Sequence, residues 1–214
     1  MIKACIFDLD GVIVDTAHYH FLAWKRLAED LGIKFTERDN ERLKGVSRIK
    51  SLEILLEIGN MKLTDEVKNQ LAEKKNLWFN EFIEKMKPEE IFPGVEALLQ
   101  ELKSKGIHIA LASSSKNAHR VVERLGIEES FEVMVDGTMI THTKPDPEIF
   151  LLAARRLNID PKDCLVIEDA EAGVEAARAA GMKCIGVGSV EQLHKADKIV
   201  KNTADFKYND LLLL

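Results

Sequence analysis

From Pro93 onward, the sequence alternates short apolar runs with longer segments of helical periodicity. Buried strands are predicted at 107–112, 131–135, 164–167 and 184–187. Asp146-Pro147 favours a helix start, because an acidic cap followed by proline suits the first turn. Such alternation is typical of a parallel sheet with helices on both faces. With a further apolar run at 4–7, it predicts an α/β fold with a Rossmann-like, doubly wound parallel sheet.

The segment between that first apolar run and Pro93 has helical patterns instead. One helix is expected at 16–31, and Ser47 and Thr64 carry side chains preferred at the N-caps of two more. The apolar face of the third helix is expected to consist of Val67, Leu71, Trp78, Phe82 and Met86. We therefore expect a small all-helical cap domain at 16–88, inserted into a core domain formed by 1–15 and 89–214.

Composition limits the classes of partner. The formal net charge of -6 argues against nucleic acid, because polyanionic surfaces select basic proteins. The sequence has no long apolar run or signal-peptide pattern, and 211–214 is too short to span a bilayer. Its three cysteines lack zinc or redox spacing and are an odd number. These features favour a cytoplasmic protein with no membrane partner, in which the cysteines are small core residues.

Two acidic residues, one position apart, end the first apolar run. Asp8 and Asp10 project to the same side, because side chains alternate along a strand. Like charges are costly to bury, so the pair indicates either an acidic turn or a cation site. Glu168-Asp169 repeats the pattern after another predicted strand. Because the carboxyl ends of parallel strands share one edge, the two pairs would form an oxygen-rich site that suits Mg²⁺.

Two further segments could contact a phosphate. Ser113-Ser114-Ser115-Lys116-Asn117 places hydroxyls and a cation at a helix N-terminus, which favours an anion. A serine that only caps the helix would give the same pattern. Lys144, before Pro145, could offset negative charge at the acidic pairs, although most loop lysines are simply solvated.

The predicted cap contains three unusual features. His20 lies on the apolar stripe of its helix, either as a core histidine or at the domain junction. Lys75 also falls on an apolar stripe, so its stem covers apolar surface or its charge faces a ligand. Lys44-Gly45-Val46-Ser47-Arg48 leads into a helix with an arginine at its start, which suits phosphate but also occurs on ordinary surfaces.

Several common catalytic motifs are missing from the sequence. GxxxxGK[ST], GxGxxG after a strand, GxSxG and HExxH do not occur. P-loop transfer, dinucleotide redox chemistry, serine hydrolysis and zinc proteolysis therefore lack support.

Taken in chain order, four segments resemble the four motifs of the haloacid dehalogenase superfamily: Phe7-Asp8-Leu9-Asp10-Gly11-Val12, Ser113, Lys144-Pro145 and Glu168-Asp169. The resemblance covers the whole chain. Within the superfamily, the chain is most similar to the β-phosphoglucomutase family, on the basis of Asp15-Thr16 with His20, the 44–48 segment, Lys75-Asn76 and 113–117. Ser114 departs from the small residue expected there, at little cost if the backbone N–H contacts the phosphate.

The resemblance implies an isomerase that interconverts β-D-glucose 1-phosphate and glucose 6-phosphate. It implies an aspartyl-phosphate on Asp8 and a β-glucose 1,6-bisphosphate intermediate, which also serves as phosphoryl primer. Asp10 would be the general acid and base, held by Thr16 and His20 as the cap closes. The implied ligands of Mg²⁺ are Asp8, Asp10, Glu168 and Asp169.

The remaining implied roles concern phosphate and sugar. Ser113, Ser114 and Lys144 would contact the transferring phosphoryl group. The distal phosphate would bind Arg48, Ser115, Lys116 and Asn117. The sugar would contact His20, Lys75 and the residues Gly45, Val46, Ser47, Arg48 and Ser51.

Other functions use the same residues differently. A sugar-phosphate phosphatase would admit water to the aspartyl-phosphate and would have less need of Arg48 and Lys75. A non-catalytic binding protein would not need the intact set of Asp8, Asp10, Lys144 and Asp169. Dehalogenation would leave the second aspartate and the Glu168-Asp169 pair without a task. The resemblance thus favours a monomeric enzyme whose partner is a small sugar phosphate.

Overall fold

The computed structural model describes residues 1–43 and 46–214. The chain divides into two compact units, one formed by Met1–Asp15 with Lys87–Leu214 and the other by Thr16–Met86. We call the first the core and the second the cap. None of the described helices is long and apolar enough to cross a membrane.

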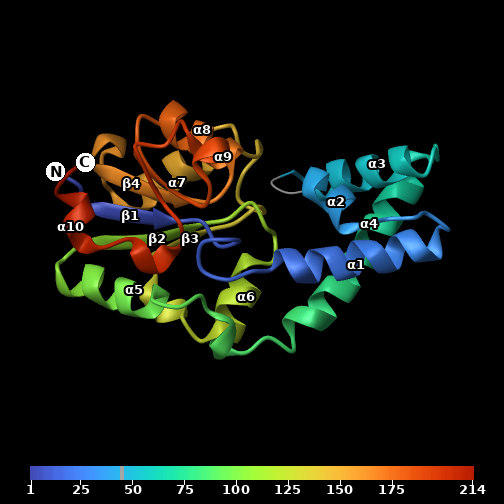
Figure 1. Cartoon of the computed structure of the whole chain (residues 1–214), viewed down its shortest axis with the longest axis horizontal. Helices are drawn as coiled ribbons and strands as arrows, with labels where there is room; N and C mark the ends of the chain where they lie inside the picture. The colour runs from blue at the N-terminus through green and yellow to red at the C-terminus, as the bar shows by residue number, and fades with distance from the viewer. Residues whose placement is uncertain (44–45) are drawn as a thin grey trace. The chain divides into compact units, whose positions relative to one another are not determined.

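The core is built on six parallel strands in the order β3-β2-β1-β4-β5-β6 (Figure 1). The strands are β1 Ala4–Phe7, β2 His108–Ala112, β3 Val133–Val135, β4 Cys164–Glu168, β5 Lys183–Val187 and β6 Lys198–Val200. This is the order of a doubly wound sheet, in which the chain runs outward from β1 and then returns to its other side at β4. The predicted α/β fold is therefore confirmed.

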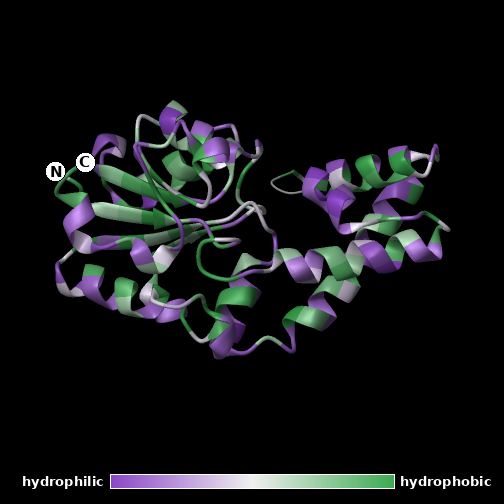
Figure 2. Cartoon of the chain, in the orientation of Figure 1, coloured by the Kyte–Doolittle hydropathy of each residue, from purple (hydrophilic) through white to green (hydrophobic). Residues whose placement is uncertain are grey.

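Helices cover both faces of the sheet (Figure 1). They are α5 Val95–Ser104, α6 Ala118–Leu125, α7 Glu148–Leu157, α8 Glu171–Ala179, α9 Val190–Leu193 and α10 Tyr208–Leu211. Because side chains alternate along a strand, Ala4 and Ile6 of β1 face a buried cluster that includes Phe150 of α7 and Val174 of α8. Figure 2 shows the strands as apolar and the surrounding helices as banded, as expected for a sheet buried on both sides.

The cap contains α1 Ala17–Asp30, α2 Glu37–Asn40, α3 Arg48–Ile58 and α4 Asp65–Ile83. Short 3₁₀ helices complete the chain at Glu41–Leu43, Pro88–Glu90, Glu128–Ser130, Pro161–Asp163 and Thr203–Asp205. The two expected N-caps are present, since the Ser47 hydroxyl accepts from the Lys50 N–H and the Thr64 hydroxyl from the Val67 N–H.

The apolar face predicted for α4 was only partly correct, since Trp78 is buried as expected but most other members of the face are not. Its buried residues are Ala72, Lys75, Trp78, Phe79 and Ile83. Val67 is 37% exposed, and Met86 lies beyond the helix end although it is buried. The packing of α4 against α1 sets the buried face, and Lys75, which was expected on the apolar stripe, is part of it.

Three smaller expectations also needed correction. The strand expected at 131–135 begins two residues later, because a 3₁₀ turn occupies Glu128–Ser130. The sixth strand and α2 were not predicted, since Lys198–Val200 and Glu37–Asn40 are too short to show a period. The helix α7 begins one residue later than Asp146-Pro147 indicated, because Pro147 is its N-cap, although the Asp146 Oδ1 still accepts from the Glu148 N–H at 2.9 Å.

Candidate active site

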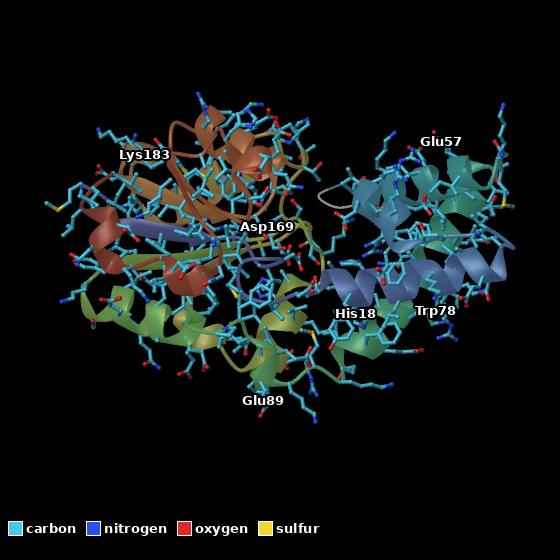
Figure 3. All side chains as sticks on the ribbon, viewed as in Figure 1. His18, Glu57, Trp78, Glu89, Asp169 and Lys183 are labelled. Carbon is cyan, nitrogen blue, oxygen red and sulfur yellow. The ribbon has the colours of Figure 1, made fainter. Side chains whose placement is uncertain are left out.

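Acidic residues gather where β1 and β4 end, at the centre of the sheet. Asp8 directly follows β1, and its N–H donates to the Ile167 carbonyl of β4 at 2.9 Å. Glu168 is the last residue of β4, and Asp169 comes next; Figure 3 shows Asp169 beyond the ends of the strands. In a doubly wound sheet this is where the winding direction reverses, which opens a crevice for ligands.

Lys144 reaches this edge from the loop before α7. Its Nζ donates to Asp8 Oδ1 at 2.5 Å, to Glu168 Oε2 at 2.7 Å and to the Ala112 carbonyl at 3.3 Å. The Nζ also lies 4.8 Å from the ring centroid of Phe150. The Lys144 side chain is 7% exposed, so this lysine is not a solvated surface charge. One ammonium thus holds the two buried carboxylates together.

Negative charge still exceeds positive charge at this edge. Burial raises the pKa of Asp8 to about 8, against the opposing effect of the Lys144 charge. Burial and the charges of Glu168, Asp8 and Asp10 raise the pKa of Asp169 to about 9. For Lys144, burial favours the neutral form, but the charges of Asp8 and Glu168 outweigh it and raise its pKa. The site therefore favours a further cation.

The donor atoms present suit a magnesium ion. One carboxylate oxygen each from Asp8, Glu168 and Asp169 lie within 4.8 Å of one another. All are oxygen ligands, which Mg²⁺ prefers, and burial together with their mutual repulsion raises the pKa values of Asp8 and Asp169. Asp10 lies outside this cluster of three.

Two glycines keep space around these carboxylates. Gly11 has φ +77°, and a Cβ built on it would lie 1.9 Å from Asp169 Oδ2. A Cβ on Gly173 would lie 2.0 Å from Glu168 Cδ. A side chain at either position would displace a carboxylate of the cluster.

The segment after β2 is organised by its own serines. The buried Ser113 accepts from the Ser115 N–H at 3.1 Å, and Ser115 accepts from the Asn117 N–H at 3.2 Å. Both hydroxyls thus shape the approach to α6, while Lys116 is exposed. Among the described residues, the Ser114 Oγ is buried without a hydrogen-bond partner.

Asp136 is a residue at this edge that the sequence analysis missed. It follows β3 and is buried, and its Oδ1 accepts from both the N–H and the hydroxyl of Thr138. Its position directly after a short apolar run, like that of Asp8, was the signal that could have revealed it.

The predicted substrate residues of the cap form a second polar group. The Lys75 Nζ lies 2.7 Å from His20 Nδ1 and 4.7 Å from the ring centroids of Trp24 and Phe79. The His20 ring stacks on Phe79 at 3.9 Å between centroids. Burial, then the charges of Lys75 and Arg48, lower the pKa of His20 well below its usual value. A neutral His20 therefore accepts the lysine hydrogen bond.

The other predicted cap residues differ in exposure. Thr16 and Ser51 are buried, Ser47 caps α3, and Val46 is 40% exposed. Arg48 begins α3 and forms an ion pair with Glu73 at 2.7 Å. Gly45, also expected to contact substrate, lies outside the described residues.

The comparisons with known proteins concern nearly the whole chain. The haloacid dehalogenase-like hydrolase family matches residues 2–181. The chain belongs to this family. It is 49% identical to a β-phosphoglucomutase of Bacillus subtilis over 95% of this chain and 91% of that protein. It is also 38% identical to a phosphorylated carbohydrates phosphatase of Thermotoga maritima, over 93% and 90% of the two chains.

Solved structures agree with these sequence relationships. A β-phosphoglucomutase from Clostridium difficile matches with a TM-score of 0.94 and 45% identity, covering 100% of this chain and 96% of that one. The predicted membership of the haloacid dehalogenase superfamily is thus confirmed, and so is the similarity to β-phosphoglucomutases.

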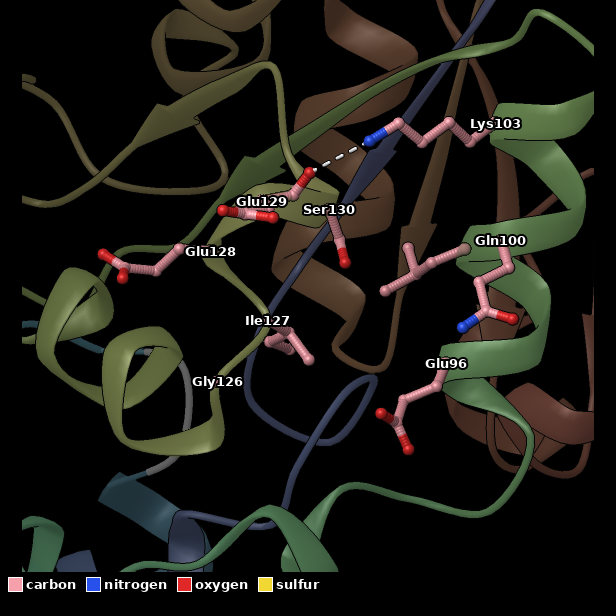
Figure 4. Close-up of a pocket in the computed structure, with 9 residues that line it drawn as sticks. Glu96, Gln100, Lys103, Gly126, Ile127, Glu128, Glu129 and Ser130 are labelled. Carbon is pink, nitrogen blue, oxygen red and sulfur yellow. Dashed lines mark hydrogen bonds between the residues drawn. The ribbon is translucent and has the colours of Figure 1, made fainter.

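A cavity of about 490 Å³ elsewhere in the core does not include the acidic residues (Figure 4). It lies between α5 and the segment that follows α6, and Glu96, Gln100 and Ile127 contribute to its lining. Lys103 donates across it to the Glu129 carbonyl at 3.2 Å. This cavity is therefore separate from the carboxylate cluster of Asp8, Glu168 and Asp169.

Proposed function

We propose that the chain is a β-phosphoglucomutase that interconverts β-D-glucose 1-phosphate and glucose 6-phosphate. The carrying observation is that each unit has its own cationic group suited to phosphate: Lys144 beside Asp8 in the core, and Arg48 at the start of α3 in the cap. A bisphosphate intermediate needs two such groups, whereas simple hydrolysis needs one. The 49% identity to the Bacillus subtilis β-phosphoglucomutase supports the same activity.

Asp8 is the proposed nucleophile. Its carboxylate attacks phosphorus and becomes an aspartyl-phosphate, while the sugar oxygen leaves. Lys144 lies close enough to neutralise charge on the phosphoryl oxygens, and it also fixes the Asp8 oxygen that it contacts. Ser113, buried at the end of β2, is proposed as a further phosphoryl contact.

Asp8, Glu168 and Asp169, with the backbone carbonyl of Asp10, are proposed to hold Mg²⁺. The ion would supply positive charge to the transferring phosphoryl group. Glu168 has a second task, since it accepts from Lys144 and from the Asp169 and Ala170 N–H groups, and so keeps the donor set in place.

Asp10 is proposed as general acid and base for the sugar hydroxyl. It protonates the leaving oxygen in one half-reaction and accepts the proton of the attacking hydroxyl in the other. A free aspartate has a pKa near 3.9, so its protonation at neutral pH depends on its surroundings. Thr16 and His20 are proposed to position it.

Arg48, Ser115, Lys116 and Asn117 are proposed to bind the distal phosphate. Lys75 and the segment 45–51 would contact the sugar. β-Glucose 1,6-bisphosphate would restore phosphorylated Asp8 whenever hydrolysis removes the phosphoryl group. Three free, buried cysteines are consistent with a reducing compartment, and we place the enzyme as a monomer in the cytoplasm.

A sugar-phosphate phosphatase is the second candidate. The 38% identity to the Thermotoga maritima phosphatase favours it, because the same core serves both reactions. The two activities differ in whether a sugar hydroxyl or water attacks the aspartyl-phosphate.

Phosphorus NMR separates these candidates. The enzyme is incubated with β-glucose 1-phosphate, Mg²⁺ and catalytic glucose 1,6-bisphosphate, with Asp8→Asn as the inactive control. We expect glucose 6-phosphate to accumulate with little inorganic phosphate. Inorganic phosphate as the main product would reject the mutase and support the phosphatase.

A further inference from the structure

Positive charge collects at the start of α3 in the cap. Arg48 is the first residue of this helix, Lys50 lies in its first turn, and the Ser47 hydroxyl caps it. The described first turn contains no acidic residue. Because a helix N-terminus carries partial positive charge of its own, an anion is favoured at this point.

Glu73 of α4 supplies a carboxylate to this cationic end. Its Oε1 accepts from Arg48 Nη1 at 2.7 Å, although the two residues are 25 positions apart. The Arg48 side chain is 22% exposed and that of Glu73 is 69% exposed. A carboxylate oxygen thus occupies a place on the guanidinium that a phosphate oxygen would also take.

We propose that Glu73 is an internal competitor for the phosphate site at Arg48, and so determines affinity for phosphorylated sugars. The inference rests on the proposed function, which assigns the distal phosphate to Arg48. An exposed ion pair is weak, so a phosphate dianion can displace Glu73 without a large cost. The carboxylate keeps Arg48 paired when no phosphate is bound, and lowers the affinity of the site when one arrives.

A positioning role for Glu73 would have the opposite sign. If the carboxylate only oriented the guanidinium for phosphate, its removal would weaken substrate binding. If it competes, its removal strengthens binding. The direction of the change in KM therefore distinguishes the two roles.

The test is Glu73→Gln, which removes the charge with little change in shape. Because a well-formed exposed pair contributes about 0.4–1 kcal/mol, we expect the KM for β-glucose 1-phosphate to fall about two- to fivefold. We expect kcat to change by less than twofold. Glu73→Asp keeps the charge, and its KM should stay closer to the wild-type value.

Glu57→Gln is the matched control. Glu57 pairs with Arg42 at 3.3 Å in the same cap, and its side chain is 70% exposed, nearly the same as Glu73. If removing any glutamate from an exposed pair with arginine changes KM, both variants should therefore show that change. We expect Glu57→Gln to leave KM and kcat unchanged.

A second measurement needs no turnover, which separates this inference from the proposed function. Inorganic phosphate is titrated into the full chain while the Arg48 Nε–Hε NMR signal is followed, with Arg48→Ala to assign that signal. We expect Glu73→Gln to shift the titration midpoint to a two- to fivefold lower phosphate concentration. Equal midpoints, or a higher midpoint in Glu73→Gln, would overturn the proposal whether or not the mutase assay succeeds. If the mutase assay fails but the midpoint still shifts as expected, only the proposed function is rejected.

Discussion

Lys144 in the core and Arg48 in the cap are both cations paired with carboxylates, but their surroundings differ. Lys144 contacts two carboxylates whose side chains are at most 8% exposed. Arg48 contacts Glu73, which is mostly exposed. Burial makes the core charges depend on one another, because an unpaired buried charge is costly. In the cap, Glu73 is largely open to water, which screens its charge, so this pair can exchange partners at low cost.

This difference suits two separate tasks. A phosphoryl-transfer centre must hold its charges in one arrangement throughout the reaction, which a buried network does. A site for the distal phosphate must release and rebind it as the bisphosphate changes orientation. Exposure of the Arg48 pair permits that exchange.

Lys144→Met should have the largest effect. It leaves the carboxylates of Asp8 and Glu168 buried without their cation, so we expect a loss of about 3–5 kcal/mol of unfolding free energy without metal. Turnover should fall at least about 10²-fold, as when other charge-stabilising groups are removed. Denaturant unfolding with and without Mg²⁺ measures the first effect, and the mutase assay measures the second.

Lys103→Met is the control for that prediction. Lys103 donates only to the Glu129 carbonyl among the hydrogen bonds described, and it is exposed. We expect its stability to stay within about 0.5 kcal/mol of wild type, as for ordinary surface changes. A similarly small change for Lys144→Met would show that the core charges are not interdependent.

Gly11→Ala should strongly reduce activity. The new Cβ would collide with Asp169, and the positive φ adds a backbone cost of about 1–2 kcal/mol. Gly106→Ala is a matched control, since it has φ +72° with no atom within 4 Å of the added Cβ. Both variants should lose a similar amount of unfolding free energy. We expect only Gly11→Ala to lose turnover and also Mg²⁺ affinity, which calorimetry measures. Equal activity in the two variants would refute the proposed role of Asp169.

Arg48→Ala should have an intermediate effect that is confined to the sugar. We expect weaker binding and slower conversion of β-glucose 1-phosphate, by at least about tenfold, because a charge-assisted hydrogen bond contributes about 1.5–3 kcal/mol. Formation of the aspartyl-phosphate from acetyl phosphate should be unchanged, as seen by intact-protein mass spectrometry. If that step slows equally, Arg48 serves the whole reaction and the division of tasks fails.

His20 should give the smallest effect, a pH dependence of stability. Its pKa is lowered in the folded cap by burial and by the Lys75 and Arg48 charges. A histidine whose pKa is lowered on folding stabilises the fold when the pH is above its pKa in the unfolded chain, near 6.5. This stability is lost as the pH falls through the pKa in the folded state. We expect His20→Gln to lose less unfolding free energy than wild type between pH 7.5 and 5. His108→Gln, at an exposed position, should follow wild type.

The sequence predicted site residues best where an acidic residue ends an apolar run that forms a buried strand. Asp8 and Glu168 end apolar runs, and the sheet then brings those ends together, so their proximity followed from strand order alone. The buried face of α4 followed only in part. Lys75 was expected on its apolar stripe, but the groups that accommodate its ammonium, His20 and two aromatic rings from the same cap, were not. Only tertiary packing provides those partners.

Contacts between distant residues were also beyond the sequence. Glu73 lies on an exposed part of α4, and nothing in its local pattern indicates that it pairs with Arg48. Asp136 follows a predicted strand, but its burial depends on how that strand packs in the folded core. Such contacts depend on how elements pack, which periodicity does not report.

The central claim is that Asp8 carries a phosphoryl group that a sugar, and not water, receives. The most direct measurement is a single turnover in which enzyme phosphorylated by acetyl phosphate is mixed with β-glucose 1-phosphate and quenched at intervals. We predict that the phosphoryl group appears first in glucose 1,6-bisphosphate and much faster than inorganic phosphate is released. Release of inorganic phosphate at the rate seen without sugar, with no bisphosphate formed, would contradict the account.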